Sequence, residues 1–344
     1  MTDTNALRII PAEEAFAVPE QMAEMRKVVE NWSGGYDPDI FLWEKMLSGS
    51  PLTRRLLDLD GERIQIMDEA GIAMQLLSLT STGVQMFDPD TAVAVAEVAN
   101  DRLAELIGRF PTRFAGLATV APQDPARAVK ELERSINTLG LNGLVINSHT
   151  NGEYLSDRKY WPILEAAAEL GAPLYIHPRS PTPLMAPAYR EDHLEHAIWG
   201  YQAETGLHGL RLITSGVFDA FPKLKVILGH MGEGIPYWFY RIDWMHDMTK
   251  SLDMVRAELQ MKPSDYFRRN FAITTSGVNW DPPLKYNLDV LGADNVMFAV
   301  DYPYQETHES VNWLRALDLP ADVKAKLAGG NAERIFKIKA PAAA

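Results

Sequence analysis

Three hydrophobic segments of the chain each end on a residue type that binds metals, and this feature most restricts the fold. Leu174–His177 ends on an imidazole, Lys225–His230 ends on a second imidazole, and Asn295–Asp301 ends on a carboxylate. Apolar runs of this length are typical of strands buried in a parallel sheet. Because the carboxyl ends of parallel strands lie at one edge, the sequence predicts that these three terminal side chains share a site.

The whole chain has the pattern of alternating strands and helices that predicts an α/β fold, a (β/α)8 TIM barrel. Strands are predicted at 7–12, 74–79, 114–120, 141–147, 174–177, 225–230, 271–274 and 296–299. Single helices are predicted over 53–70 and 204–221, among others. Excursions rich in aromatic and polar residues, at about 32–52 and 181–201, are predicted to be loop insertions, the first a lid or a subunit contact. The length of 344 residues suits one large barrel, so we expect 1–344 to be a single domain.

Composition excludes several kinds of partner and site. The formal net charge of −13 argues against a nucleic acid or an anionic membrane as partner. The chain has no cysteine, so any metal must be held by His, Asp and Glu. No run approaches the roughly 18 apolar residues of a membrane span, and the amino terminus lacks a signal-peptide pattern. We therefore expect a cytoplasmic protein.

A fourth ligand-type residue, Glu13, follows the first predicted strand. Glu13, His177, His230 and Asp301 then all lie at strand ends, where barrels of this kind place their reactive groups. Mixed nitrogen and oxygen ligands suit Zn, Mn or Fe, and one imidazole with two carboxylates favours a harder ion such as Mn.

Other residues near the strand ends are candidates for binding a substrate. His149 follows the fourth strand and is either a substrate contact or part of the loop structure. Arg179 and Arg241 are candidate clamps for a carboxylate, although each could instead be a structural ion-pair partner. Tyr304 could form a wall of an aromatic pocket, although aromatic residues more often pack in the core. The glycine spacing of Gly229–Gly234 fits neither a dinucleotide-binding fingerprint nor a phosphate-binding loop.

With these residues in view, the chain resembles the amidohydrolase superfamily. Within it, the resemblance is to the aromatic-acid decarboxylases related to aminocarboxymuconate semialdehyde decarboxylase, above all those acting on 5-carboxyvanillate, γ-resorcylate and 2,3-dihydroxybenzoate. It covers essentially the full length. The matching stretches are 13–16 (EEAF), 147–150 (NSHT), 175–179 (YIHPR), 204–208 (ETGLH), 215–219 (SGVFD), 229–233 (GHMGE), 274–280 (TTSGVNW) and 301–305 (DYPYQ).

The chain departs from the superfamily in ways that bear on its metal content. Amidohydrolases usually carry His-x-His after strand one, whereas this chain has Glu13-Glu14-Ala15. No lysine ends strand four to bridge two metals. The resemblance therefore implies a barrel of the metal-dependent hydrolase type with one divalent metal, held by Glu13, His177 and Asp301. Mn²⁺ is expected, with Zn²⁺ or Mg²⁺ as alternatives, and no organic cofactor.

The resemblance also implies roles for the residues around the metal. The expected reaction is nonoxidative decarboxylation of a hydroxylated benzoate, with Asp301 protonating the ring carbon and His230 and Glu233 relaying the proton. Arg241 would bind the substrate carboxylate. Arg54 or Arg55 would reach the site of a neighbouring subunit, so that a homodimer or homotetramer is the active form.

Two other functions compete with this one. A metal-dependent hydrolase of the same fold, acting on a lactone or ester of aromatic catabolism, would consume water and release acid instead of CO2. A barrel that only binds a ligand is a third reading, which the four strand-end ligand residues disfavour.

Overall fold

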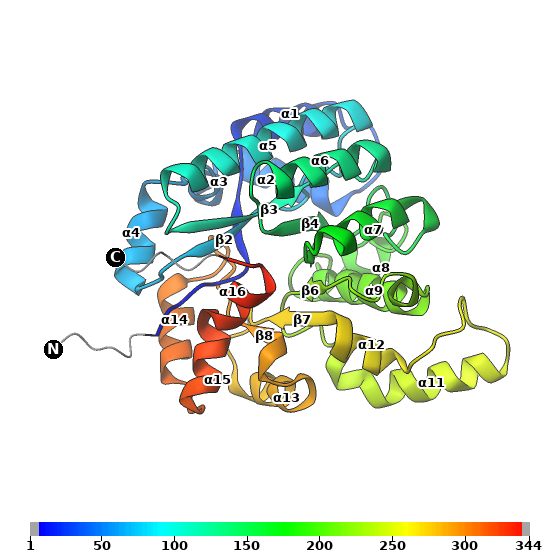
Figure 1. Ribbon diagram of the computed structural model, residues 1–344. Helices are drawn as coiled ribbons and strands as arrows, with labels where there is room; N and C mark the ends of the chain where they lie inside the picture. The colour runs from blue at the N-terminus through cyan, green and yellow to red at the C-terminus, as the bar shows by residue number, and fades with distance from the viewer. Residues whose placement is uncertain (1–6, 339–344) are drawn as a thin grey trace.

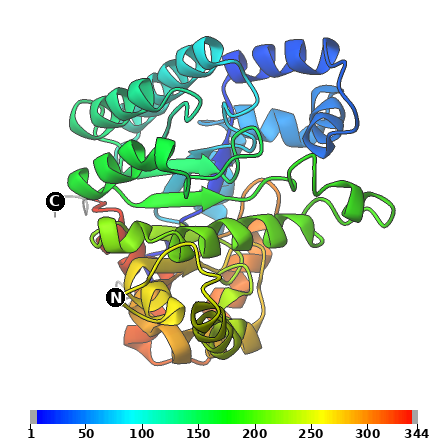
Figure 2. The same cartoon turned by 90° about the vertical axis from the view of Figure 1, so that its right-hand side faces the viewer.

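The computed structural model describes residues 7–338 as a closed parallel barrel (Figures 1 and 2). Each strand pairs in parallel with the next, in the order β1 to β8. The strands are β1 Glu14–Phe16, β2 Gln75–Leu79, β3 Phe114–Thr119, β4 Gly143–Asn147, β5 Leu174–His177, β6 Val226–Leu228, β7 Phe271–Thr274 and β8 Val296–Met297. A parallel bridge between Glu14 and Tyr302 joins the first strand to the segment after the last. The predicted (β/α)8 barrel is confirmed.

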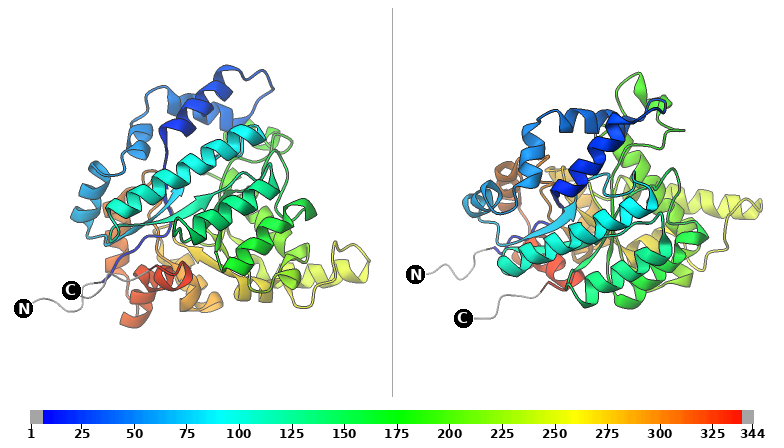
Figure 3. Two further views of the ribbon diagram at one scale, coloured as in Figure 1. Left: turned by 45° about the horizontal axis from the view of Figure 1, so that its top comes forward. Right: turned by 90° about the horizontal axis from the view of Figure 1, so that it is seen from above.

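Helices surround the barrel, and Figures 1 and 3 show α11 extending beyond the others. They are α1 Pro19–Glu30, α2 Pro38–Leu47, α3 Pro51–Leu57, α4 Glu62–Ala70, α5 Pro89–Arg109, α6 Pro125–Asn137, α7 Trp161–Leu170, α8 Pro187–Arg190, α9 Gly200–Thr214, α10 Val217–Ala220, α11 Phe239–Ser251, α12 Pro263–Asn270, α13 Asp281–Leu291, α14 Thr307–Ala316, α15 Ala321–Ala325 and α16 Asn331–Ile335. Within residues 7–338, none is both long and apolar enough to cross a bilayer.

The barrel interior is a separate apolar cluster from the core between strands and helices. Successive side chains of a strand point to opposite faces, so each strand contributes alternate residues to the interior. These include Leu76, Leu117, Val145, Tyr175, Ile227, Ala272 and Met297. This packing fills the barrel below the carboxyl ends of the strands and leaves the functional groups above it.

The prediction for the first strand is wrong in position. Strand β1 is Glu14–Phe16, whereas residues 7–12 make one isolated bridge, between Ile9 and Ile72. Pro11 has no N–H to donate, so a regular ladder cannot run through this segment. Its neighbours bond elsewhere, because Ile10 N donates to Ala328 O at 2.8 Å and Ala12 N donates to Phe298 O at 3.0 Å. The segment is buried all the same, and its hydrophobicity produced the wrong prediction.

Two predicted helices are each divided. The 53–70 helix is broken between α3 and α4, where the Asp58 side chain accepts from Gly61 N and Glu62 N, both at 2.8 Å. The 204–221 helix is broken at Gly216, whose φ of 81° lies outside the helical region. The 32–52 insertion carries α2, and the 181–201 insertion carries the short α8.

Candidate active site

Glu13 immediately precedes β1, His177 ends β5 and Asp301 follows β8, and the three side chains come together. One ligand atom of each lies within 4.8 Å of the other two. The backbone holds two of them directly, because Asp301 N donates to Glu13 O at 3.1 Å. Glu13 is buried, whereas the His177 and Asp301 side chains are 11% and 14% exposed. The cluster is thus buried on the side of Glu13 and partly exposed to solvent at His177 and Asp301.

Two hydroxyl groups fix the Glu13 carboxylate. Tyr175 Oη donates to Glu13 Oε2, and Thr274 Oγ1 donates to the same oxygen at 3.0 Å. Burial opposes ionisation, but the charges of His230 and His177 and these two hydrogen bonds lower the pKa of Glu13. Its other oxygen, Oε1, is buried without a hydrogen-bond partner. A buried carboxylate with one free oxygen is a suitable metal ligand.

The His177 imidazole has a defined tautomer. Its Nδ1 lies 2.8 Å from the Pro178 carbonyl, which can only accept, so Nδ1 carries the hydrogen. In the neutral form of the ring, Nε2 then carries no hydrogen, and it lies 3.5 Å from Glu13 Oε1. A backbone carbonyl that orients a ligand imidazole in this way is common around metals.

His230 and Glu233 lie on a turn of left-handed conformation. The φ angles of His230, Met231, Gly232, Glu233 and Gly234 are 44°, 57°, 75°, 54° and 76°. Residues other than glycine resist this conformation by roughly 1–2 kcal/mol each. The turn is stabilised where Met231 N donates to Thr274 O at 2.8 Å and where the Met231 side chain is buried. The glycines of 229–234 therefore serve this turn, in agreement with the rejection of a phosphate-binding loop.

The turn creates a buried ion pair beside Asp301. His230 Nδ1 donates to Glu233 Oε1 at 2.9 Å, and His230 Nε2 lies 4.0 Å from Asp301 Oδ2. Burial alone would lower the pKa of His230, but the carboxylates of Glu233 and Glu13 raise it well above the ordinary value. Burial and the charge of Glu13 raise the pKa of Asp301, opposed by His230. The surrounding carboxylates thus favour the protonated form of His230, close to Asp301.

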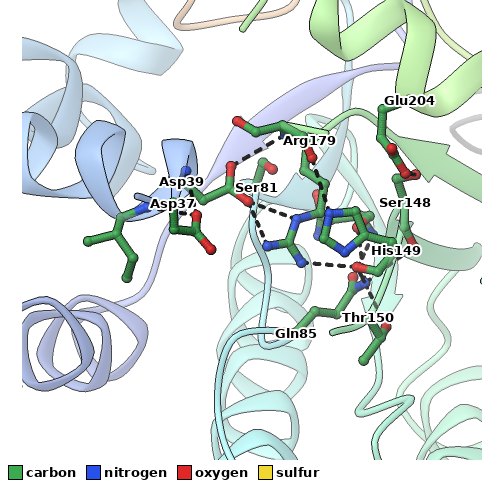
Figure 4. A network of polar contacts seen from close by, with 12 residues as sticks. Asp37, Asp39, Ser81, Gln85, Ser148, His149, Thr150, Arg179 and Glu204 are labelled. Atoms are coloured by element: carbon green, nitrogen blue, oxygen red, sulfur yellow. Dashed lines mark hydrogen bonds and ion pairs between the residues drawn. The ribbon is translucent and has the colours of Figure 1, made fainter. Parts of the chain in front are cut away.

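Two of the predicted substrate-binding residues are held by other groups of the chain (Figure 4). Arg179 is buried and pairs with Asp39 at 2.6 Å. His149 accepts from Gly152 N at 3.2 Å on Nδ1 and donates from Nε2 to Ser180 O at 3.1 Å. Burial and the charge of Arg179 lower the pKa of His149 to about 2, so its ring is neutral. The sequence left two roles open for Arg179 and His149, binding a substrate or supporting the structure. These contacts match the structural role.

Tyr304 and Arg55 were also predicted to bind a substrate, and the structure places them in different environments. Tyr304 is 37% exposed, its N donates to Asp301 O at 2.8 Å, and its hydroxyl contacts Thr80. Arg55 donates to Glu62 of its own chain at 3.2 Å.

Arg241, on α11, makes no ion pair or hydrogen bond through its side chain within residues 7–338. It lines a largely apolar cavity of about 440 Å³ that Glu233, Trp199 and Trp238 also line.

Sequence reasoning missed several residues of this site. Tyr175 could have been found, because it stands two residues before His177 and therefore points to the same face of β5. Thr274 ends β7 and could have been found as a strand-end residue. Asp39 and Ser81 carry no comparable signal, since their positions depend on how loops pack.

Another missed residue, Glu204, supports a prediction about stability. Its buried carboxyl accepts from Ser148 Oγ and Tyr154 Oη, both at 3.1 Å, and burial raises its pKa from 4.5 to about 7.

Because the pKa of Glu204 is raised in the folded protein, folding favours its protonated form. The stability that Glu204 contributes in this form is complete below about pH 4.5 and is lost as the pH approaches 7. Between pH 5 and 8 the native protein should lose roughly 2.5 kcal/mol more stability than the Glu204→Gln variant, which has no carboxyl group to titrate at this position. Urea unfolding at both pH values measures this difference, and parallel pH profiles would contradict it.

Comparisons with known proteins agree with the geometry. A profile of the Amidohydro_2 family, described as Amidohydrolase, matches residues 36–338. A gamma-resorcylate decarboxylase of Polaromonas sp. is 37% identical over 338 residues, which cover 96% of this chain and 98% of that protein.

Two solved structures are closely similar to the chain. A 5-carboxyvanillate decarboxylase from Sphingomonas paucimobilis has a TM-score of 0.94 and 47% identity, covering 97% of this chain and 100% of the other. The 5-carboxyvanillate decarboxylase of Novosphingobium aromaticivorans, complexed with manganese and 4-hydroxy-3-methoxy-5-nitrobenzoic acid, has a TM-score of 0.93 and 40% identity, covering 97% of each chain. With a family profile over most of its length and relatives that match it from end to end, the chain belongs to the amidohydrolase family.

Proposed function

We propose that this protein is a metal-dependent, nonoxidative decarboxylase of a hydroxylated benzoate, a carbon–carbon lyase. The observation that carries the proposal is the cluster of Glu13, His177 and Asp301 beside the charged His230. Decarboxylation of an aromatic acid needs a bound anion and a proton donor at one ring carbon, and this group of residues can supply the donor. The gamma-resorcylate and 5-carboxyvanillate decarboxylases that match the chain from end to end support the same reaction class.

The proposed cofactor is one divalent metal, Mn²⁺, held by Glu13, His177 and Asp301. The free Oε1 of Glu13 and the Nε2 of His177, which is the ring nitrogen not bonded to Pro178, fit such an ion. One imidazole and two carboxylates suit a hard ion, and manganese is bound in the related structure from Novosphingobium aromaticivorans. When bound, the ion supplies positive charge that attracts the oxygens of an anionic substrate.

The chain's own residues then move the proton. Asp301 would give a proton to the ring carbon that bears the carboxylate. The bond from that carbon to the carboxylate breaks, its electron pair restores the aromatic ring, and CO2 leaves. His230, whose Nε2 lies 4.0 Å from Asp301 Oδ2, would return a proton to Asp301 through one bridging water, and Glu233 keeps the His230 ring oriented. Tyr304, beside Asp301, is placed to border the substrate ring.

Arg241 is the proposed binding group for the substrate carboxylate. Its support is a guanidinium without an acidic partner, in the described part of the chain, that lines the same cavity as Glu233. Arg241→Met should raise KM by about 10- to 100-fold, because a hydrogen bond to a charged group contributes roughly 1.5–3 kcal/mol. Steady-state kinetics against substrate concentration measures the change. The neighbouring Arg256→Met, which removes a contact with Asp157, should leave KM unchanged, and an equal effect in both variants would contradict the assignment.

The experiment that tests the function is a CO2 and ultraviolet assay of purified protein with known metal content. The substrates are 5-carboxyvanillate, 2,3-dihydroxybenzoate and 2,6-dihydroxybenzoate, each with and without a chelator. Metal-dependent CO2 release from one of them supports the proposal and identifies its ring substituents. Release of acid from a lactone or ester, without CO2 from any of the three, would instead indicate a hydrolase.

We also propose that the active form is a homodimer or homotetramer and that 1–344 acts as one domain. Support comes from apolar side chains that α11 and its flanks leave exposed, among them Trp238, Tyr240, Trp244, Leu252 and Met254. Exposed apolar side chains gathered on one element are typical of a surface that binds another protein. Arg55, near the 32–52 insertion, is the residue proposed to reach a neighbouring site. Light scattering of the native protein and of Trp244→Glu tests the assembly, since a monomeric native protein would contradict it.

A further inference from the structure

A buried ion pair joins the 32–52 insertion to the segment that follows His177 (Figure 4). Asp39, in the first turn of α2, accepts on Oδ2 from Arg179, at 2.9 Å from Nε and 2.6 Å from Nη2. Its Oδ1 accepts from Ser180 N at 3.3 Å. The two charged side chains are only 3% and 4% exposed. Charges this far from water require a well-defined partner, because removing one leaves the other uncompensated.

Arg179 is held from a second side as well. Its Nη1 donates to His149 O at 3.0 Å, in the segment after β4. That segment is itself fixed by Gln85, which donates to His149 O at 2.9 Å and accepts from Asn147 N at 2.6 Å. Arg179 is therefore anchored between the first insertion and the loop after β4.

The anchored arginine controls a carbonyl of the metal site. Only Pro178 separates Arg179 from His177, and the peptide unit between Pro178 and Arg179 contains the carbonyl that accepts from His177 Nδ1 at 2.8 Å. The proline ring fixes φ, so the position of Arg179 determines where this carbonyl points. Ser81 Oγ donates to the same oxygen at 3.0 Å. The carbonyl in turn makes Nε2 the free nitrogen of His177.

We infer that Asp39 is a positioning residue for the metal site, acting through Arg179 and the Pro178 carbonyl on the tautomer and direction of the His177 ring. The inference rests on the proposed role of His177 as a metal ligand. Groups that orient a ligand imidazole typically change metal affinity by about 10- to 100-fold when they are removed. On this view the first insertion is a supporting part of the metal site.

The test is a titration of metal-free protein with Mn²⁺ alone, in which the free ion is followed by electron paramagnetic resonance. Asp39→Asn keeps the size of the side chain and removes its charge, and we expect Mn²⁺ affinity to fall by about 10-fold or more. The His177 Nδ1–H signal in nitrogen-15 NMR should broaden or shift in the same variant. Tyr36→Phe is the matched control, because it removes a different contact of the same insertion, to Glu195, and does not touch Arg179. Its Mn²⁺ affinity should be native.

The outcomes separate this inference from the proposed function. A folded Asp39→Asn variant with native Mn²⁺ affinity overturns the inference, and so does an equal loss of affinity in Tyr36→Phe. If Asp39→Asn does not fold, Arg179→Lys is used instead, since it retains a charge for Asp39 but loses the two-point contact, and the same criteria apply. His177→Ala should abolish tight binding. Native affinity in that variant would refute the metal site itself.

Discussion

Replacing Asp301 by asparagine is expected to reduce kcat by roughly 10²- to 10⁴-fold, the usual contribution of a positioned proton donor. Asparagine has nearly the same shape and still offers one oxygen, but it has no acidic proton to transfer. The measurement is kcat from ultraviolet loss of substrate, at an Mn²⁺ concentration that saturates the variant, with bound metal determined on the same sample.

Saturation with metal is essential because Asp301 is also a proposed ligand. Asp294→Asn, which alters an ion pair with Lys326, serves as the control and should retain native kcat. If Asp301→Asn retains both Mn²⁺ and native kcat, Asp301 is not the proton donor. If kcat recovers fully as Mn²⁺ is raised, Asp301 acts only as a ligand.

Gly229→Ala should abolish tight metal binding although the substitution adds a single methyl group. A β-carbon at this position would lie 2.8 Å from Glu13 Oε2, closer than real β-carbon contacts, and 3.2 Å from Glu13 Oε1, tighter than most of them. The carboxylate cannot move away freely, because Tyr175 and Thr274 both bond to Oε2. We expect Mn²⁺ affinity to fall by at least about 10- to 100-fold, and kcat/KM to fall with it.

Calorimetric titration with Mn²⁺ and a thermal melt of each protein measure the two effects separately. Gly108→Ala is the control, since a β-carbon there meets no atom within 4 Å. A Gly229→Ala variant that binds Mn²⁺ with native affinity would show that the position of Glu13 does not limit metal binding. A Gly229→Ala variant that has a lower melting temperature but native Mn²⁺ affinity would lead to the same conclusion.

The sequence was sufficient to predict the barrel and to select residues that the fold brings together. His177 and Asp301 could be selected because strand ends of a parallel barrel converge, whatever the loops do. Glu13 was selected as the end of a strand predicted at 7–12, although it in fact precedes β1. The first strand was misplaced because hydrophobicity reports burial, and residues 7–12 are buried without forming a ladder. Periodicity also continues smoothly past Gly216, so the break between α9 and α10 required knowledge of the backbone angle.

Contacts between loops could not be predicted in the same way. Asp39 and Arg179 are 140 positions apart, and neither lies at a position that periodicity constrains to face the other. An arginine two residues after a ligand histidine reads equally well as a substrate clamp or as an ion-pair partner. Only the path of the 32–52 insertion decides between them, and that path follows from packing against the barrel.

The left-handed turn at 230–234 has a consequence for the order in which the molecule assembles. Nothing in the local preference of His230, Met231 or Glu233 favours this backbone conformation, so the turn cannot serve as an early nucleus of folding. It depends on the hydrogen bond to Thr274, and therefore on β6 and β7 being already paired. His230 and Glu233 therefore owe their positions to the paired barrel strands and not to the local sequence around them. A substitution that weakens the pairing of β6 with β7 should displace these two side chains even though it lies outside the site.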